Sequence, residues 1–143
     1  MKTRILIIIF VFLLVIFLFQ PVRSSTGIGF ILGEPTGLSL RIDNFPVIGI
    51  AWSLNNYFHI HCDYWINTPH IKKGLYWYWG FGGKMTSHIQ SGNNLSFGMR
   101  VPLGLRYFPS KKIEIFFEIA PGLIIIPETA SDFDIGLGMR FIL

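Results

Sequence analysis

The sequence predicts an all-β protein: a closed antiparallel up-and-down barrel of eight transmembrane strands, preceded by a signal-peptide helix. Three observations predict it. Apolar residues alternate with glycine and charged residues from Gly27 to Leu143, which is the period-two pattern of strands with two different faces. Charged residues make up only 14% of the chain, whereas soluble domains carry about 25%. After the amino-terminal segment, no apolar run reaches the roughly 20 residues that a membrane helix needs.

The first element is an amino-terminal export signal. Lys2 and Arg4 precede the apolar run at 5–19, and Gln20 and Pro21 end that run. A basic start, a short apolar run and small residues before a cleavage point are the layout of a secretory signal peptide. An uncleaved membrane anchor is the alternative, but this run is shorter than a spanning helix.

We therefore divide the chain into a signal peptide at 1–24 and an outer-membrane β-barrel at 25–143. Without the signal, nine basic residues face eight acidic ones, so the net charge falls from +4 to about +1. No basic stripe is left to indicate a nucleic-acid partner. Cys62 is the only cysteine, so an internal disulfide is excluded.

Eight segments of the mature part carry the alternation, and clusters of Gly, Pro, Asn and Ser separate them. They lie near 27–33, 37–43, 47–54, 57–65, 74–85, 95–108, 112–125 and 132–143. No helical segment intervenes, so neighbouring strands are expected to form antiparallel hairpins. An even number brings the first strand beside the last, and closure is required because open edges cannot be satisfied in lipid.

The segment at 95–108 shows why the apolar face should point outward. Its odd positions are all apolar, and its even positions include Gly98, Gly104, Arg100 and Arg106. A soluble barrel would place the second face in water, where glycine weakens a strand. Inside a narrow eight-stranded barrel, by contrast, glycine leaves room for side chains from other walls. We therefore expect apolar residues to face lipid, which penalises an exposed Lys or Arg by about 2–4 kcal/mol.

On this alternation, five basic and five acidic groups point into the lumen. Buried charges are tolerated when they are paired, so we expect a lumen charge network, with Asp43 as a further inward acid. The network comprises Arg41, Asp63, Lys84, Arg100, Arg106, Glu114, Glu118, Asp134 and Arg140.

Two features interrupt the pattern. Pro102 and Pro121 fall inside strands, where each removes a ladder hydrogen bond. The alternation also slips at 124–126. We expect a bulge or the barrel rim near these positions.

The ordered motifs of the mature chain resemble a family of small bacterial outer-membrane proteins with a barrel akin to the OmpA transmembrane domain. The first is Gly33-Glu34-Pro35-Thr36-Gly37-Leu38-Ser39, and further matches lie at 100–105, 118–121, 127–129 and 136–141. The resemblance implies a cell outer-membrane location, insertion by the outer-membrane assembly machinery, and a host or envelope protein as a partner. The chain departs from such barrels in ending Phe141-Ile142-Leu143 rather than in an aromatic residue.

Two groups of polar residues could form a functional site, and each also has a structural interpretation. His59, His61 and Asp63 lie on one face and have ligand types that suit zinc. No fourth ligand with suitable spacing follows, so we expect a polar network and no metal. Glu114 and Glu118 could form an acid–base pair, but Arg100 and Arg106 on the preceding strand are natural ion-pair partners.

Glu34 and Glu128 lie in Pro/Thr-containing turns at the ends of strands that become neighbours on closure. They define a possible polar cluster at one barrel mouth, the alternative being two tight turns capped by Thr hydroxyls.

The sequence therefore favours a monomeric outer-membrane barrel with a structural or interaction role, a plugged lumen, no cofactor and no catalysis. A lipid-modifying enzyme with a Ser–His pair near the rim is one alternative. Its candidate residues are Ser39, Ser53, Ser87, Ser96, His70 and His88. A narrow channel is the other.

Overall fold

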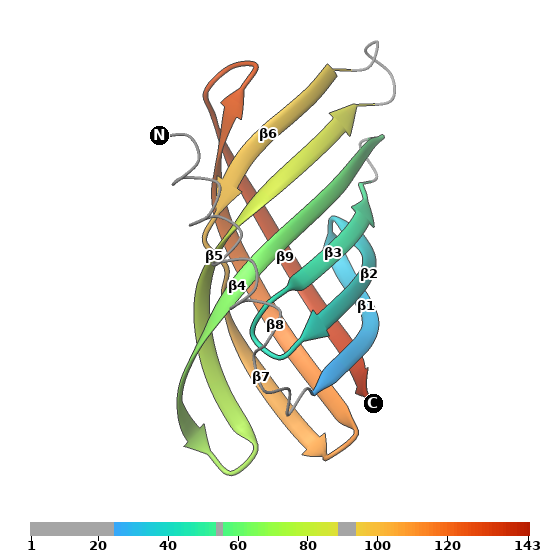
Figure 1. Ribbon diagram of the computed structural model, residues 1–143, viewed down its shortest axis with the longest axis vertical. Helices are drawn as coiled ribbons and strands as arrows, with labels where there is room; N and C mark the ends of the chain where they lie inside the picture. The colour runs from blue at the N-terminus through green and yellow to red at the C-terminus, as the bar shows by residue number, and fades with distance from the viewer. Residues whose placement is uncertain (1–24, 54–55, 89–93) are drawn as a thin grey trace, which may run out of the picture.

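The computed structural model describes residues 25–53, 56–88 and 94–143, so the expected signal peptide lies outside the described residues. Within these ranges the chain forms nine β-strands (Figure 1). They are β1 (Thr26–Glu34), β2 (Thr36–Ile42), β3 (Val47–Trp52), β4 (Tyr57–Lys72), β5 (Leu75–His88), β6 (Asn94–Arg100), β7 (Leu103–Ser110), β8 (Ile113–Ile126) and β9 (Ala130–Ile142). The described part of the chain contains no helix that is long and apolar enough to cross a membrane.

The nine strands fill eight positions around the wall of a closed antiparallel barrel, and each position is called a stave below. β6 and β7 both pair with β5 on one side and with β8 on the other, so they are two halves of one stave. Every other strand pairs with its neighbours in chain order, and β1 pairs with β9. The predicted fold class is therefore confirmed.

The stave breaks at Val101 and Pro102, where the sequence predicts an irregularity. The Val101 amide donates to the Pro121 carbonyl at 2.9 Å, and the Gly80 amide donates to the Pro102 carbonyl at 2.9 Å. Close by, the pairing of β6 with β8 shifts register between Phe97 and Gly98. Because proline has no N–H, the wall continues across this point through irregular hydrogen bonds.

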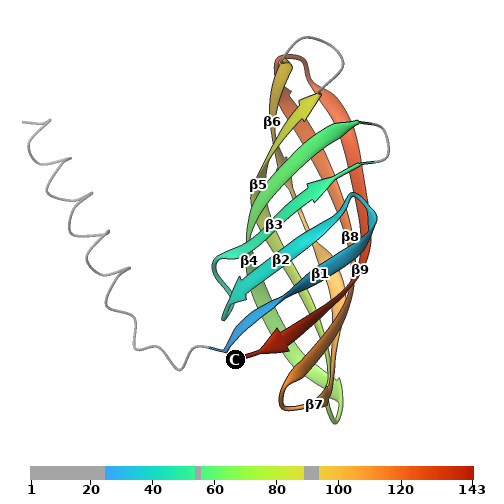
Figure 2. The same ribbon diagram turned by 90° about the vertical axis from the view of Figure 1, so that its right-hand side faces the viewer.

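The strands are strongly tilted. Each residue can be followed to its partner on the next strand, starting from Gly27 on β1 and passing through β2 to β8. This path reaches β9 at Asp132, whereas Gly27 itself pairs with Ile142. One circuit of the wall therefore shifts by ten residues, from 132 to 142, and such a stagger requires tilt. Figure 2 shows the strands running obliquely across the barrel.

The wall is also uneven in height. β1, β2 and β3 have 9, 7 and 6 residues, whereas β4, β5 and β8 have 16, 14 and 14. The sequence-based end of β4 at Trp65 is wrong, because β4 continues to Lys72. Register shifts between Asn67, His70 and Lys72 let it keep pairing with β5 where the alternation is lost.

The two ends of the barrel differ in their connections. The terminus end holds the start of β1, the end of β9 and the turns at 43–46, 73–74 and 111–112. There the Leu143 amide donates to the Thr26 carbonyl at 2.9 Å. The loop end holds the turn at Pro35, the end of β3, the start of β4, the end of β5, the start of β6 and the turn at 127–129.

The orientation of the two faces agrees with the alternation. Phe97, Val101 and Leu105 are 47%, 44% and 42% exposed on the outer surface, whereas Arg100 and Arg106 are 2% and 6% exposed. These three apolar side chains therefore lie outside the barrel and the two arginines lie inside it, as the alternation along this segment predicts.

Candidate functional site

The interior side chains form three layers along the barrel axis, and three positions of β8 contribute one side chain to each layer. Glu114, Phe116 and Glu118 follow one another at alternate positions, and none is more than 7% exposed. Each belongs to a different group of interior side chains. A charged group on the terminus side, an aromatic layer and a second charged group succeed one another along the strand.

Glu114 is the centre of the terminus-side group. Its carboxylate accepts hydrogen bonds from Arg106 Nε at 2.7 Å and Arg41 Nε at 2.9 Å, and Arg140 Nη1 lies 3.4 Å away. Arg140 also donates from Nε to Ser39 Oγ at 2.8 Å. Three guanidinium groups therefore surround one carboxylate that has no exposure to solvent.

Trp65, Tyr78 and Phe116 form the aromatic layer. The Trp65 and Tyr78 rings stack at 3.8 Å between centroids, and Phe116 meets Trp65 edge-on at 6.0 Å. The Arg140 guanidinium lies 3.8 Å from the Phe116 ring and 4.8 Å from the Trp65 ring. Cation–π contacts of this kind hold the guanidinium against the layer.

Interior glycine makes this packing possible. A Cβ atom on Gly138 would lie 2.1 Å from Phe116 Cζ, and one on Gly104 would lie 2.5 Å from Tyr78 Cζ. The rings therefore lie directly over the neighbouring strands, which is the close packing that the narrow lumen was expected to require.

Arg100 is the centre of the loop-side group. Its guanidinium contacts Glu118, Asp134 at 2.9 Å and Asp63 at 3.3 Å. It also lies 3.2 Å from the Nδ1 atom of His61. Tyr78 joins the aromatic layer to this group, because its hydroxyl donates to Glu118 at 2.8 Å.

Lys84 extends the loop-side group toward the loop end. Its ammonium contacts Asp132 and lies 3.2 Å from Asp134. Asp132 is missing from the sequence-predicted network, although it shares the parity of Asp134 on β9. The alternation could have found it, since the position two residues further along a strand lies on the same face.

The three residues weighed as metal ligands lie in the interior as neighbours. His59 Nε2 and His61 Nδ1 are 2.9 Å apart, which is a hydrogen bond between the rings, and His61 Nε2 lies 3.8 Å from Asp63. Within 25–53, 56–88 and 94–143, no group of three or more His, Cys, Asp or Glu residues is arranged to hold a metal ion.

The two glutamates of the expected mouth cluster lie apart. Glu34 accepts hydrogen bonds from Ser53 Oγ and, at 3.1 Å, from the Tyr57 hydroxyl. Glu34 pairs with Ile135, whereas β9 continues to Ala130 before the turn that carries the exposed Glu128. The first turn is capped by its threonine, since Thr36 Oγ1 donates to the Gly33 carbonyl at 2.8 Å.

Charge is distributed unequally along the barrel axis. Among the residues that the structure describes, seven basic and two acidic side chains lie on the terminus side of the aromatic layer, including its turns. They are Arg41, Lys72, Lys73, Arg106, Lys111, Lys112 and Arg140, with Asp43 and Glu114. On the loop side, the same described ranges place two basic and six acidic side chains. They are Lys84 and Arg100, with Glu34, Asp63, Glu118, Glu128, Asp132 and Asp134.

These features define a class: a small eight-stranded β-barrel with an apolar outer surface and an ion-paired, aromatic interior. Residues 20–143 match the family model described as "Protein of unknown function (DUF3996)", and the chain belongs to that family. A comparison with curated protein sequences gave no match.

Among solved structures, the barrel is similar to the crystal structure of Neisserial surface protein A (NspA). The TM-score is 0.55 at 8% sequence identity, and the match covers 84% of this chain and 94% of the neisserial chain. This similarity shows a shared fold.

Proposed function

We propose that the mature chain inserts into a bacterial outer membrane as a monomeric barrel with a structural or interaction role and without catalysis. The observation that carries the proposal is the belt of apolar side chains over a closed sheet. Leu38, Met99 and Leu137 are 59%, 58% and 52% exposed, on staves from different parts of the wall. Lipid chains solvate such an apolar surface, and a closed sheet leaves no strand edge with unpaired backbone groups in the lipid.

The expected signal peptide at 1–24 supports export, and the barrel of Neisserial surface protein A supports the same compartment. Outer-membrane barrels have short periplasmic turns and longer outer loops. On that rule the terminus end faces the periplasm and the loop end faces outward. A host or envelope protein would then meet the loop end, whereas the assembly machinery would meet β9.

The lumen is proposed to be closed to ions. Trp65, Tyr78 and Phe116 are at most 1% exposed and contact one another, and charged side chains bind one another on both sides of them. An eight-stranded barrel has an interior just wide enough for side chains. We therefore expect no steady single-channel current in planar bilayers. Currents that change on substitution of Arg100 or Glu114 would instead support a narrow channel.

Location and orientation can be tested with an epitope tag at two matched sites. One tag follows Glu128 in the β8–β9 turn, and the other follows Lys111 in the β7–β8 turn. Antibody should bind intact cells only when the tag follows Glu128, and both tagged proteins should fractionate with the outer membrane. Equal binding to both on intact cells, or recovery in the soluble fraction, would contradict the proposal.

A further inference from the structure

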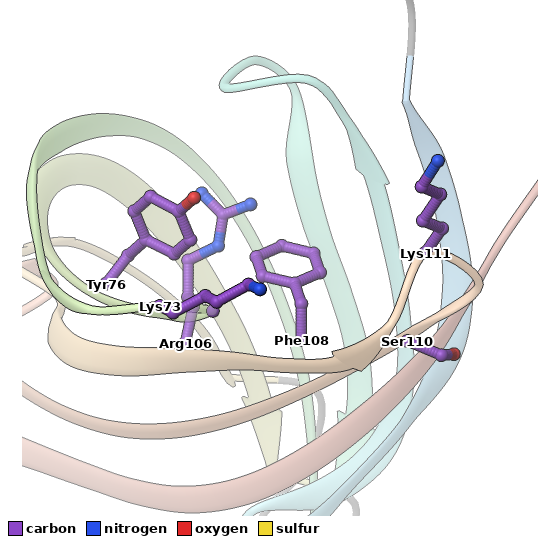
Figure 3. Close-up of a pocket in the computed structure, with 7 residues that line it drawn as sticks. Lys73, Tyr76, Arg106, Phe108, Ser110 and Lys111 are labelled. Carbon is purple, nitrogen blue, oxygen red and sulfur yellow. The ribbon is translucent and has the colours of Figure 1, made fainter.

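The terminus end of the lumen opens into a pocket of about 670 Å³. Ligand pockets usually have volumes of about 300–1,000 Å³, so this vestibule has room for a small molecule. It is lined by Lys73, Gly74, Tyr76, Arg106, Phe108, Ser110 and Lys111. Figure 3 shows the side chains of Lys73 and Arg106 beside the Tyr76 and Phe108 rings, with Ser110 and Lys111 farther along the rim.

The lining combines cationic groups with an apolar corner. The Tyr76 and Phe108 rings meet at 83° with centroids 5.9 Å apart, and the Arg106 guanidinium lies 5.2 Å from the Phe108 ring. Three basic side chains line this pocket, and none of its lining residues is acidic. Such a surface attracts a negative group and also offers a ring face to an apolar one.

The two acidic groups described on the terminus side of the aromatic layer are already engaged. Glu114 lies among Arg41, Arg106 and Arg140, and Asp43 accepts a hydrogen bond from the Ser25 amide at 2.9 Å. The terminus side of the barrel therefore keeps its cationic excess. A cleft whose walls carry one sign of charge concentrates ions of the opposite sign.

We propose that this vestibule binds a small organic anion, in which a carboxylate or phosphate is joined to a ring-bearing or apolar body. Lys73 and Lys111 bind the anionic group at the rim, Arg106 supports it from below, and Tyr76 and Phe108 pack against the body. This inference goes beyond the proposed function, because neither export nor membrane insertion requires a ligand.

Phenyl phosphate is a suitable probe, with inorganic phosphate and benzyl alcohol as the two half-probes. The folded protein in a non-ionic detergent is titrated with each compound and followed by amide chemical shifts in NMR. Phenyl phosphate should bind more tightly than either half-probe, with the largest shifts at Gly74, Tyr76 and Phe108. Absence of saturable binding, or equal binding of inorganic phosphate, would overturn the proposal.

The sequence offers a matched control for charge. The double substitution Lys73→Gln/Lys111→Gln removes two charges from the vestibule. Lys72→Gln/Lys112→Gln removes two charges from the adjacent positions in the sequence, which are outside its lining. We expect the first to weaken phenyl phosphate binding about tenfold, as the loss of two exposed ion pairs implies, and the second to change it less than twofold.

Equal effects of the two double substitutions would show attraction to net charge alone and would overturn the site. Gel mobility before and after boiling shows that each variant is folded, so failure to fold is distinguished from failure to bind. Failure of this site would leave the membrane proposal untouched, because the tag experiment measures location independently.

Discussion

Replacing Glu114 by Gln tests the ion-paired interior most severely. The substitution keeps the shape of the side chain and removes its charge, which three arginines share. Afterwards Arg41, Arg106 and Arg140 remain close together in the interior without the carboxylate between them. Each is at most 6% exposed, so water cannot easily replace the lost partner.

The magnitude follows from the geometry. At charge separations of about 4 Å and an effective dielectric constant of 20, each of the three contacts contributes about 4 kcal/mol of gross attraction. Much of this is offset, because burial of the carboxylate removes its hydration, and the neutral amide avoids that penalty. Breaking a buried ion pair by removing one partner costs about 3–5 kcal/mol. Because Gln can still accept one hydrogen bond, we expect a loss of about 3 kcal/mol.

The assay is equilibrium unfolding by urea in lipid vesicles, followed by tryptophan fluorescence and gel mobility. Glu128→Gln is the matched control, because that side chain is exposed in the β8–β9 turn and its substitution should leave the midpoint unchanged. A second substitution, Arg140→Met, should restore part of the lost stability by removing one unpaired cation. If Glu114→Gln unfolds at the same urea concentration as the parent, the reasoning about the interior is refuted.

Two further predictions concern packing and sidedness. Gly138→Ala should lower the free energy of unfolding by about 1–3 kcal/mol, as overpacking does, because its Cβ would lie 2.1 Å from Phe116 Cζ. Gly83→Ala, whose Cβ would meet Gly98 O at 4.0 Å, should be tolerated in the same urea titration; equal losses would contradict the packing argument. Cys62 is exposed on the outer face of β4, so in vesicles an apolar maleimide should label it and a charged thiol reagent should not. Rapid labelling by the charged reagent, measured by mass spectrometry, would count against a lipid-facing β4.

The face on which each strand residue lies was predictable, because it depends only on whether the residue occupies an odd or an even position in its strand. Residues such as Phe97 and Arg100 differ in parity within one strand, so the sequence alone assigns them to opposite faces. The extension of β4 beyond Trp65 was not predictable in this way. There the alternation fails, and pairing with β5 through register shifts keeps the strand intact.

The sequence predicts which charged residues lie inside the barrel, but it does not predict which of them pair with one another. Parity places Arg41 and Glu114 inside, but they are 73 residues apart, and their meeting depends on the stagger of the closed wall. The expected pairing of Arg106 with the glutamates of β8 is present as the contact with Glu114, whereas Arg100 reaches Asp63 and Asp134 as well. Which carboxylate each cation pairs with depends on how the barrel closes, and the spacing of residues along the chain does not predict it.

The charge asymmetry along the axis could have been predicted and was missed. Because successive strands run in opposite directions, Lys72 at the end of β4 and Lys111 just before β8 must share one end of the barrel. Counting charges by strand end, rather than by face, gives the cationic terminus end directly. The vestibule between those turns, by contrast, depends on the continuation of β4 to Lys72, which the predicted end of that strand at Trp65 did not include.

The central claim concerns which face meets lipid, and tryptophan quenching by brominated phospholipids measures it directly. Trp65 and Trp79 lie on paired strands one residue apart in register, yet Trp65 is 1% exposed and Trp79 is 40% exposed. Two variants that each retain one of these tryptophans, refolded in vesicles, therefore compare the two faces at nearly the same depth. Strong quenching of Trp79 with little quenching of Trp65 is the predicted result, whereas equal quenching, or stronger quenching of Trp65, would contradict it.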